Sequence, residues 1–372
     1  MEDEKLYNIA KNIIDNSIKL KKDENILIEL YGIHGKPLAL EVMKYVSSIG
    51  ARAYFNIIDY DMIKIMLDNA DEKYMKTYGF CDLERMKQMD AYLAIKSADD
   101  PNILKSVSSD NMVIYNKCYT LPVHLEERVK NTKWCLINYP NEYLAKKSNV
   151  SLKEYTDLYY NVCTLDYTKL SNAMDKLVEL MKKTDKVKII GKGTDIEFSI
   201  KGIGVEKYFG TYNLPDGEVA TAPVKESING YITYNTKSCY NGIEFNNIKL
   251  VFKNGKIVET YADNKIELDK ILDTDEGARY IGEFAFGLNP YITKIMGDVL
   301  FDEKIYGSFH LTPGTSIDEF DNGNRSAIHW DLVCIQTKEY GGGEIYFDDV
   351  LIRKDGEFVL DELRFLNKEK LV

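Results

Sequence analysis

In the first half of the chain, segments with the apolar spacing of helices alternate with short apolar runs that are typical of strands. Helical spacing is present at Leu6, Ile9 and Ile13, and again over residues 37–49. Short apolar runs at 25–30, 51–58, 91–95 and 134–138 are typical of buried strands. Strands that alternate with helices predict an α/β domain with an open, mostly parallel sheet covered by helices.

A change in pattern divides the chain. Residues 151–183 have helical spacing, and the polar run Lys182-Lys183-Thr184-Asp185-Lys186 follows them. Polar segments of this kind are common at domain boundaries. We therefore expect an α/β N-terminal domain at 1–185 and a second domain at 186–372.

The second half is dominated by short strands and tight turns. Asn254-Gly255 lies between the apolar runs 248–252 and 257–260, and Asn-Gly favours a type I′ hairpin turn. Asp355-Gly356 separates 345–352 from 358–360 in the same way. One helix is expected at 267–286. The pattern predicts a mixed, mainly antiparallel β domain with a few helices.

Charge and composition exclude several classes of protein. The net charge of −11 argues against binding to nucleic acid or to an anionic membrane, both of which need a cationic face. The acidic N-terminus lacks the basic and apolar regions of a signal peptide. No apolar run approaches the roughly 18 residues of a membrane span. Six well-separated cysteines without a CxxC pattern are expected to be reduced, so we predict a cytoplasmic protein.

Two histidines and an aspartate lie close together near the C-terminus. His310 precedes His329 by nineteen residues, and His329 is followed by Trp330 and Asp331. On a strand, His329 and Asp331 would share one face and Trp330 would point to the other. An imidazole and a carboxylate that converge in this way suit a zinc-class cation. An edge-strand histidine beside a solvated aspartate is the alternative.

Two glutamates have unusual surroundings. Glu218 follows a Pro/Gly turn and enters a run of small residues, and Glu283 lies within an apolar segment. Buried carboxylates are costly unless they are paired or bind a metal, although a turn-exposed Glu218 and a helix-end Glu283 remain open alternatives. Together with His310, His329 and Asp331, they could hold two divalent ions with one bridging carboxylate.

The sequence resembles the thermophilic aminopeptidase family of metallopeptidases (aminopeptidase T and relatives). The most specific matches are LPDGEVATAP at 214–223, DEGARYIGEF at 275–284 and SAIHWD at 326–331. The resemblance implies a homodimer with a C-terminal catalytic domain. It also implies two divalent ions (zinc, cobalt, manganese or magnesium) held by Glu218, Glu283, His310, His329 and Asp331. We expect Glu283 to bridge the ions.

One position departs from the family pattern. The family has a catalytic tyrosine seven residues after the first metal-binding histidine, where this chain has Ile317. Tyr340, beside Gly341-Gly342-Gly343, is the candidate replacement by sequence, with Tyr306 as a second choice. Glu276 is the candidate general base, with Glu344 as an alternative.

These observations predict a metallo-aminopeptidase that removes the N-terminal residue of peptides with a water activated by two metals. Two other functions remain open. A ring-cleaving dioxygenase of related fold would bind one non-haem iron through His310, His329 and Asp331. A catalytically impaired homologue would bind metal without turnover.

Overall fold

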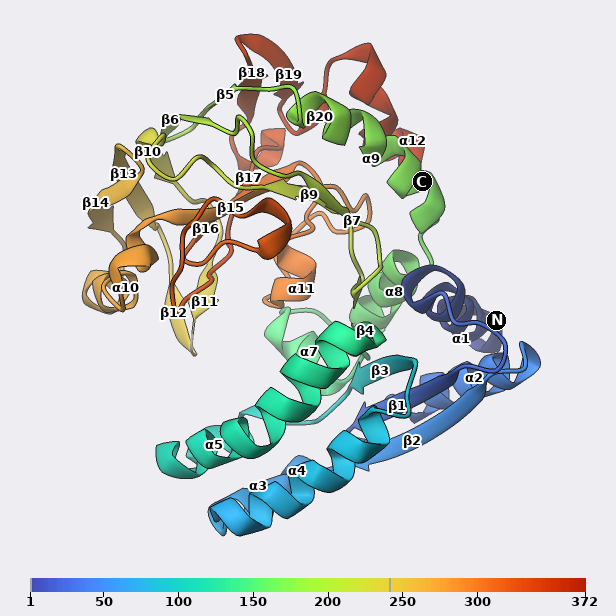
Figure 1. Ribbon diagram of the computed structural model, residues 1–372. Coiled ribbons are helices and arrows are strands. Elements are labelled where there is room, and N and C mark those ends of the chain that lie inside the picture. The colour runs from blue at the N-terminus through green and yellow to red at the C-terminus, as the bar shows by residue number, and fades with distance from the viewer. Residues whose placement is uncertain (1, 241) are drawn as a thin grey trace. The chain divides into compact units, whose positions relative to one another are not determined.

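The computed structural model describes residues 2–240 and 242–372, which form two compact units (Figure 1). The first unit comprises the residues up to 164 together with 210–215, and the second comprises 165–209 and 216–372. Residues 165–185, which the sequence analysis placed before the boundary, therefore belong to the second unit. Whether the chain folds as independent domains divided near residue 185 stays a prediction.

The first unit contains one parallel sheet, in the order β2-β1-β3-β4-β8, as the sequence predicted. Each apolar run coincides with a strand. The strands are β1 (Asn25–Tyr31), β2 (Arg52–Ile58), β3 (Ala91–Lys96), β4 (Lys133–Asn138) and β8 (Asn213–Leu214).

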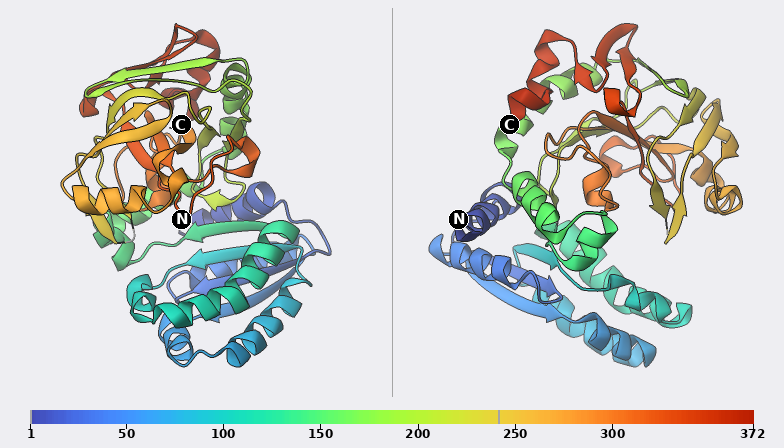
Figure 2. Two further views of the ribbon diagram at one scale, coloured as in Figure 1. Left: turned by 60° about the vertical axis from the view of Figure 1, so that its left-hand side comes forward. Right: turned by 180° about the vertical axis from the view of Figure 1, so that it is seen from behind.

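Helices cover both faces of this sheet (Figure 2). Several begin at a side chain that accepts a backbone N–H, such as Asp59, Asp71 and the capping box of Ser151 with Glu154. No helix in the described part of the chain is long and apolar enough to cross a membrane. The helical segments are α1 (Glu2–Asn12), η1 (Ile13–Ile18), α2 (Lys36–Ser48), α3 (Tyr60–Asp68), α4 (Glu72–Met86), η2 (Pro101–Ser106), α5 (Ser109–Tyr115), η3 (Asn116–Arg128), α6 (Val129–Asn131), α7 (Glu142–Lys147) and α8 (Leu152–Cys163).

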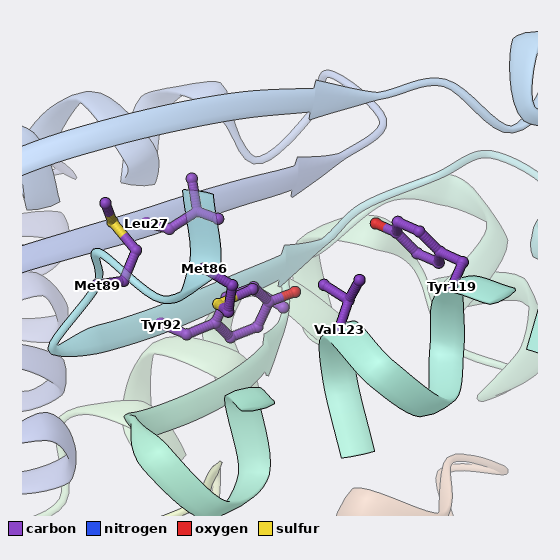
Figure 3. Close-up of a cluster of buried hydrophobic side chains, with 7 residues drawn as sticks. Leu27, Met86, Met89, Tyr92, Tyr119 and Val123 are labelled. Atoms are coloured by element: carbon purple, nitrogen blue, oxygen red, sulfur yellow. The ribbon is translucent and has the colours of Figure 1, made fainter. Parts of the chain in front are cut away.

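A cluster of buried side chains fixes α4 and η3 against one face of the sheet. Leu27 of β1 and Tyr92 of β3 pack with Met86 of α4, and Tyr119 and Val123 of η3 close the cluster (Figure 3). The other face of β1 and β2 is contacted by α2. Burial on both faces explains why β1 and β3 appear in the sequence as continuous apolar runs.

The second unit is built mainly from two antiparallel sheets, as expected. One has eight strands in the order β14-β13-β10-β6-β5-β18-β19-β20, and the other has five in the order β17-β16-β15-β9-β7. The eight are β5 (Lys186–Gly191), β6 (Thr194–Ser199), β10 (Asn229–Thr233), β13 (Lys249–Lys253), β14 (Lys256–Tyr261), β18 (Gly343–Phe347), β19 (Val350–Lys354) and β20 (Glu357–Phe358). The five are β7 (Glu206–Tyr208), β9 (Glu218–Thr221), β15 (Ile281–Gly287), β16 (Ser308–Pro313) and β17 (Leu332–Ile335).

Smaller elements complete the second unit. Strands β11 (Ser238–Tyr240) and β12 (Ile243–Phe245) form a separate two-stranded ribbon. The α-helices are α9 (Tyr167–Met181), α10 (Lys265–Leu272), α11 (Val299–Asp302) and α12 (Lys368–Leu371). Short 3₁₀-helices occur at η4 (Glu276–Arg279), η5 (Asp318–Phe320), η6 (Lys338–Tyr340) and η7 (Asp361–Leu366).

Both predicted hairpin turns are present. Asn254 and Gly255 have φ angles of 49° and 81°, which is the backbone that a type I′ turn requires. Asp355 and Gly356 likewise have positive φ angles between β19 and β20. The apolar run at 345–352 contains a further turn at Asp348-Asp349, so it forms β18 and β19 rather than one strand.

The single helix expected at 267–286 is wrong. Helix α10 ends at Leu272, Asp275 then caps the short turn η4 by accepting Ala278 N–H, and β15 begins at Ile281. A Cβ on Gly277 would lie 1.8 Å from the carbonyl oxygen of Arg325, so this backbone packs too closely for an ordinary side chain. The helical segment expected at 151–183 forms two helices, α8 and α9. The side chain of Asp166 caps the N-terminus of α9.

Strand β15 divides its side chains between two environments. Phe284 contacts the ring of Phe198 in β6, and Phe286 contacts the ring of Phe347 in β18. These contacts join the two sheets into one core. Because side chains alternate along a strand, Glu283 and Ala285 lie on the opposite face of the five-stranded sheet.

Candidate metal centre

Strand pairing gathers three of the predicted ligands on that opposite face. Ala285 pairs with Ala220 in β9 and with His310 in β16. Since residues two apart on a strand share a face, Glu218 lies on the face of Ala220, and Glu283 lies on the face of Ala285. Glu218, Glu283 and His310 are all buried and offer ligand atoms within 4.8 Å of one another.

The first group of ligands converges on one oxygen of Glu283. His310 Nε2 lies 3.4 Å from Glu283 Oε1 and 3.8 Å from Glu218 Oε2. Glu218 Oε2 is buried and accepts no hydrogen bond. A buried carboxylate oxygen without a donor is costly, so this position suits a cation.

The second group uses the other oxygen of Glu283. His329 Nε2 lies 3.3 Å from Glu283 Oε2 and 3.5 Å from Asp331 Oδ1. The ligand atoms of Glu283, His329 and Asp331 again lie within 4.8 Å of one another. All five predicted residues are therefore brought together, with Glu283 common to both groups.

His329 and Asp331 do not lie on a regular strand, contrary to expectation. His329 makes an isolated bridge with Gly314, and β17 begins only at Leu332. The backbone is held instead by Asp275, whose carboxylate accepts hydrogen bonds from Ser326 Oγ and Ala327 N at 2.7 Å each. The predicted alternation nevertheless holds.

Trp330 points away from the ligands, as predicted. Its ring packs on Tyr240 and Phe245, and its Nε1 donates to Ser238 Oγ at 2.9 Å. The indole thereby anchors the segment between His329 and Asp331 to β11 and β12.

Neighbouring groups orient the second pair of ligands. His329 Nδ1 lies 3.0 Å from the carbonyl oxygen of Thr315, so Nδ1 is the donor there and Nε2 is the ring nitrogen that faces Glu283 and Asp331. Thr312 Oγ1 donates to Asp331 Oδ1 at 2.7 Å. Such outer contacts are typical of metal-binding histidines and carboxylates.

The ligands perturb one another strongly. Burial raises the pKa of Glu218 to about 7, even though Lys304 and His310 oppose that shift. Burial also opposes ionisation of Glu283, but hydrogen bonds from His310 and His329 lower its pKa to about 2. Burial would lower the pKa values of the two histidines, but Glu283 raises them to about 9 for His310 and about 10 for His329. Without a metal, the histidines thus hold protons where cations would otherwise sit.

Two charged residues that the sequence analysis overlooked lie beside the first group. Lys304 is fully buried, and its Nζ lies 2.5 Å from Glu218 Oε1, 2.8 Å from Glu303 Oε1 and 3.6 Å from Asp216 Oδ1. Burial raises the pKa of Glu303 well above its usual range, despite the nearby Lys304. The only signal in the sequence was a charged triplet, Asp302-Glu303-Lys304, between apolar residues.

The predicted catalytic residues Tyr340 and Glu276 belong to neither ligand group. Tyr340 lies on η6, beyond the end of β17 that is farther from Asp331. Glu276 lies on η4 and lines a surface hollow with Lys256 and Arg279. Their catalytic roles stay predictions.

The donor set fits divalent metal ions. Imidazole nitrogens and carboxylate oxygens are ligands of zinc, cobalt and manganese. The model for the thermophilic metalloprotease (M29) family matches residues 2–358. The chain belongs to this family. As an M29 protein, it is a metal-dependent hydrolase of peptide bonds.

Individual M29 relatives and solved structures extend the comparison. The chain is 22% identical to aminopeptidase 2 from Geobacillus stearothermophilus over 382 residues, which cover 87% of this chain and 88% of the relative. Its fold is similar to that of wild-type AmpT from Thermus thermophilus, with a TM-score of 0.77, 19% identity and coverage of 97% and 100%. It is also similar to 2,5-dihydroxypyridine dioxygenase from Pseudomonas putida KT2440, with a TM-score of 0.62, 13% identity and coverage of 98% and 100%. The fold is therefore shared with both of these solved structures.

Proposed function

We propose that this M29 protein is an aminopeptidase that removes the N-terminal residue of peptides with two divalent ions bound to each chain. Glu218, Glu283 and His310 would hold one ion, and Glu283, His329 and Asp331 would hold the other. Zinc, cobalt, manganese and magnesium are the candidate metals. The similarity to aminopeptidase 2 supports the choice of substrate end.

The two oxygens of Glu283 carry the proposal. Oε1 faces His310, and Oε2 faces His329, so a single carboxylate serves both groups. A bridging carboxylate between two sets of ligands is the arrangement that two-metal hydrolases use. When bound, the ions would polarise the scissile carbonyl and lower the pKa of a water toward about 7.

Glu303 is our proposal for the general base. Its side chain is partly buried, it is held at 2.8 Å by Lys304, and the charges of Glu218, Asp331 and His310 act on it. The ion pair with Lys304 places the Glu303 carboxylate beside the first group of ligands, where it could take a proton from the attacking water. The same carboxyl would then give that proton to the leaving amine as the C–N bond breaks. Glu276 remains the candidate from sequence.

A metal-bound amine would explain why a free amino terminus is preferred. The nitrogen of a free α-amine has a lone pair that one of the two ions could bind, whereas an acetylated nitrogen has no available lone pair. We expect this contact to position the first peptide bond for cleavage.

Metal content and end-selectivity test the proposal together. Protein reconstituted separately with zinc, cobalt, manganese or magnesium should bind two ions per chain, as measured by elemental analysis. The active form should shorten a peptide by one residue from its free amino end and leave the N-acetylated peptide intact. Equal cleavage of both peptides would reject the assignment.

The dioxygenase alternative predicts a different metal set. A single iron would require His310, His329 and Asp331 to meet at one point, yet the ligand atoms fall into two groups that divide the histidines. Retention of one iron per chain, with consumption of dioxygen, would favour that alternative. Binding of two metals without turnover of any peptide would favour the catalytically impaired homologue.

The cytoplasmic location and the homodimer stay predictions. We propose both for the enzyme, with peptides as its partners and no nucleic acid or membrane surface. Size-exclusion chromatography with light scattering would test the dimer directly.

A further inference from the structure

Strand β7 places a tyrosine directly beside the first group of ligands. Tyr208 is the antiparallel partner of Glu218. Directly paired residues on neighbouring strands project from the same face of a sheet, with Cβ atoms about 5 Å apart. The phenol of Tyr208 is thus on the face that carries Glu283 and His310.

Tyr208 packs against a buried cluster of mostly small side chains, which includes Ala220 of β9 and Ala285 of β15. Ala285 is two residues from Glu283 and is paired with His310. Tyr208 therefore packs on the face of the sheet from which Glu283 and His310 project.

The same cluster contains the position where the family pattern expects a tyrosine. Ile317 packs against it together with Tyr208, and Phe320 is one of its buried members. Ile317 supplies only a hydrocarbon surface. Tyr208 brings a phenol to the same place from a different strand.

Electrostatics agree with this placement. Burial raises the pKa of Tyr208 well above its usual value, and the charges of Glu283 and Glu218 raise it further. The phenol therefore keeps its proton and remains a hydrogen-bond donor. The two carboxylates that raise the pKa of Tyr208 belong to β9 and β15.

The other two candidate tyrosines are engaged elsewhere. Tyr306 OH donates to Glu357 Oε2 at 2.7 Å and accepts from Lys368 N at 3.0 Å. Tyr340 follows the C-terminal end of β17, whereas Asp331 directly precedes the N-terminal end of that strand. At the usual rise per residue, β17 spans about 13 Å.

We propose that Tyr208 is a catalytic residue whose phenol donates a hydrogen bond to the oxyanion of the tetrahedral intermediate. This inference rests on the proposed aminopeptidase function. Loss of one oxyanion donor typically slows an enzyme by about 10²–10³-fold. The donor acts on the transition state, so binding of the ground-state substrate should change little.

Tyr208→Phe tests the role with three readouts. We expect kcat to fall at least thirtyfold, KM to stay within threefold and the metal content to equal that of the wild type. Affinity for a 1-aminoalkylboronic acid, which forms a tetrahedral adduct, should fall by a factor similar to that for kcat. Tyr346→Phe, which removes a phenol near the surface that bonds Glu344, is the matched control and should retain wild-type kcat.

A second variant separates a catalytic phenol from a structural ring. Tyr208→Phe/Ile317→Tyr restores a phenol within the same cluster and should recover kcat at least fivefold over Tyr208→Phe. Unchanged kcat in Tyr208→Phe, loss of metal from it, or absence of recovery in the double variant would each overturn the inference while the wild type remains an aminopeptidase. If the metal-loaded wild type cleaves no peptide, the proposed function fails and the inference fails with it.

Discussion

Lys304 and Glu218 form a buried ion pair in which the lysine occupies only one side of the carboxylate. The ammonium nitrogen lies 2.5 Å from Oε1, while Oε2 accepts no hydrogen bond and faces His310 Nε2 at 3.8 Å. Lys304 thereby orients Glu218 so that one oxygen remains for a cation.

Replacing Lys304 should destabilise the metal-free protein. Lys304→Met leaves Asp216, Glu218 and Glu303 without their buried counter-charge, and removal of one partner of such a pair costs about 3–5 kcal/mol. Urea unfolding in a chelator would measure the loss in free energy of unfolding. Saturating manganese should reduce the loss, because Glu218 then regains a neighbouring positive charge.

An exposed ion pair provides the control for this variant. Lys354 pairs with Glu344 at 2.9 Å near the surface, so Lys354→Met should leave the free energy of unfolding almost unchanged. Similar losses for both lysine variants would contradict the positioning role of Lys304.

Glu283→Gln should remove at least one metal ion from each chain. The amide keeps the shape of the side chain but lacks the negative charge that two cations would share. We expect near-complete loss of turnover with an unchanged far-UV circular dichroism spectrum. Glu197→Gln on β6, where the glutamate is exposed, should retain both ions. Full metal content in Glu283→Gln would show that the Glu283 carboxylate does not bind the metal ions.

Asp275→Ala should weaken the second ligand group selectively. Asp275 holds Ser326 and Ala327, and the segment continues directly to His329. Outer residues of this kind typically contribute 10–100-fold to metal affinity. Competitive titration with a chelator should show one weakened site and one unchanged site. Asp273→Ala, which removes a carboxylate paired with Arg279, should leave both affinities unchanged.

His124 should make the stability of the protein depend on pH below neutrality. Burial, with a further contribution from Arg128, lowers the pKa of His124 to about 4. As pH falls below about 6.5, the unfolded chain binds a proton that the folded chain excludes, so stability is lost between pH 6.5 and 4. We expect His124→Asn to abolish about 1 kcal/mol of the loss between pH 7.5 and 5.5 in urea titrations.

Local patterns predicted much of the fold. The continuous apolar runs of β1 and β3 report burial on both faces, and Asn254-Gly255 specifies its turn through backbone geometry alone. The five ligands could be chosen because histidines are rare in this chain and because carboxylates in apolar surroundings need a partner.

Other features depend on contacts that one sequence does not display. Glu283 was assigned to a helix because helical spacing continues past Leu272, whereas the close packing of Gly277 on Arg325 ends the helix. Lys304 resembles any surface lysine until the fold buries it against Glu218. Tyr208 could not be linked to Ile317, because only the pairing of β7 with β9 brings them to one cluster.

The short strand β8 has a consequence for how the chain can be divided. Asn213 and Leu214 complete the parallel sheet beside β4, although the residues on either side of 210–215 belong to the second unit. A fragment that stops at residue 185 would therefore expose the backbone donors and acceptors along one edge of β4. Unpaired edges of this kind recruit strands from other molecules, so such a fragment should aggregate. Neither unit corresponds to one uninterrupted stretch of the gene.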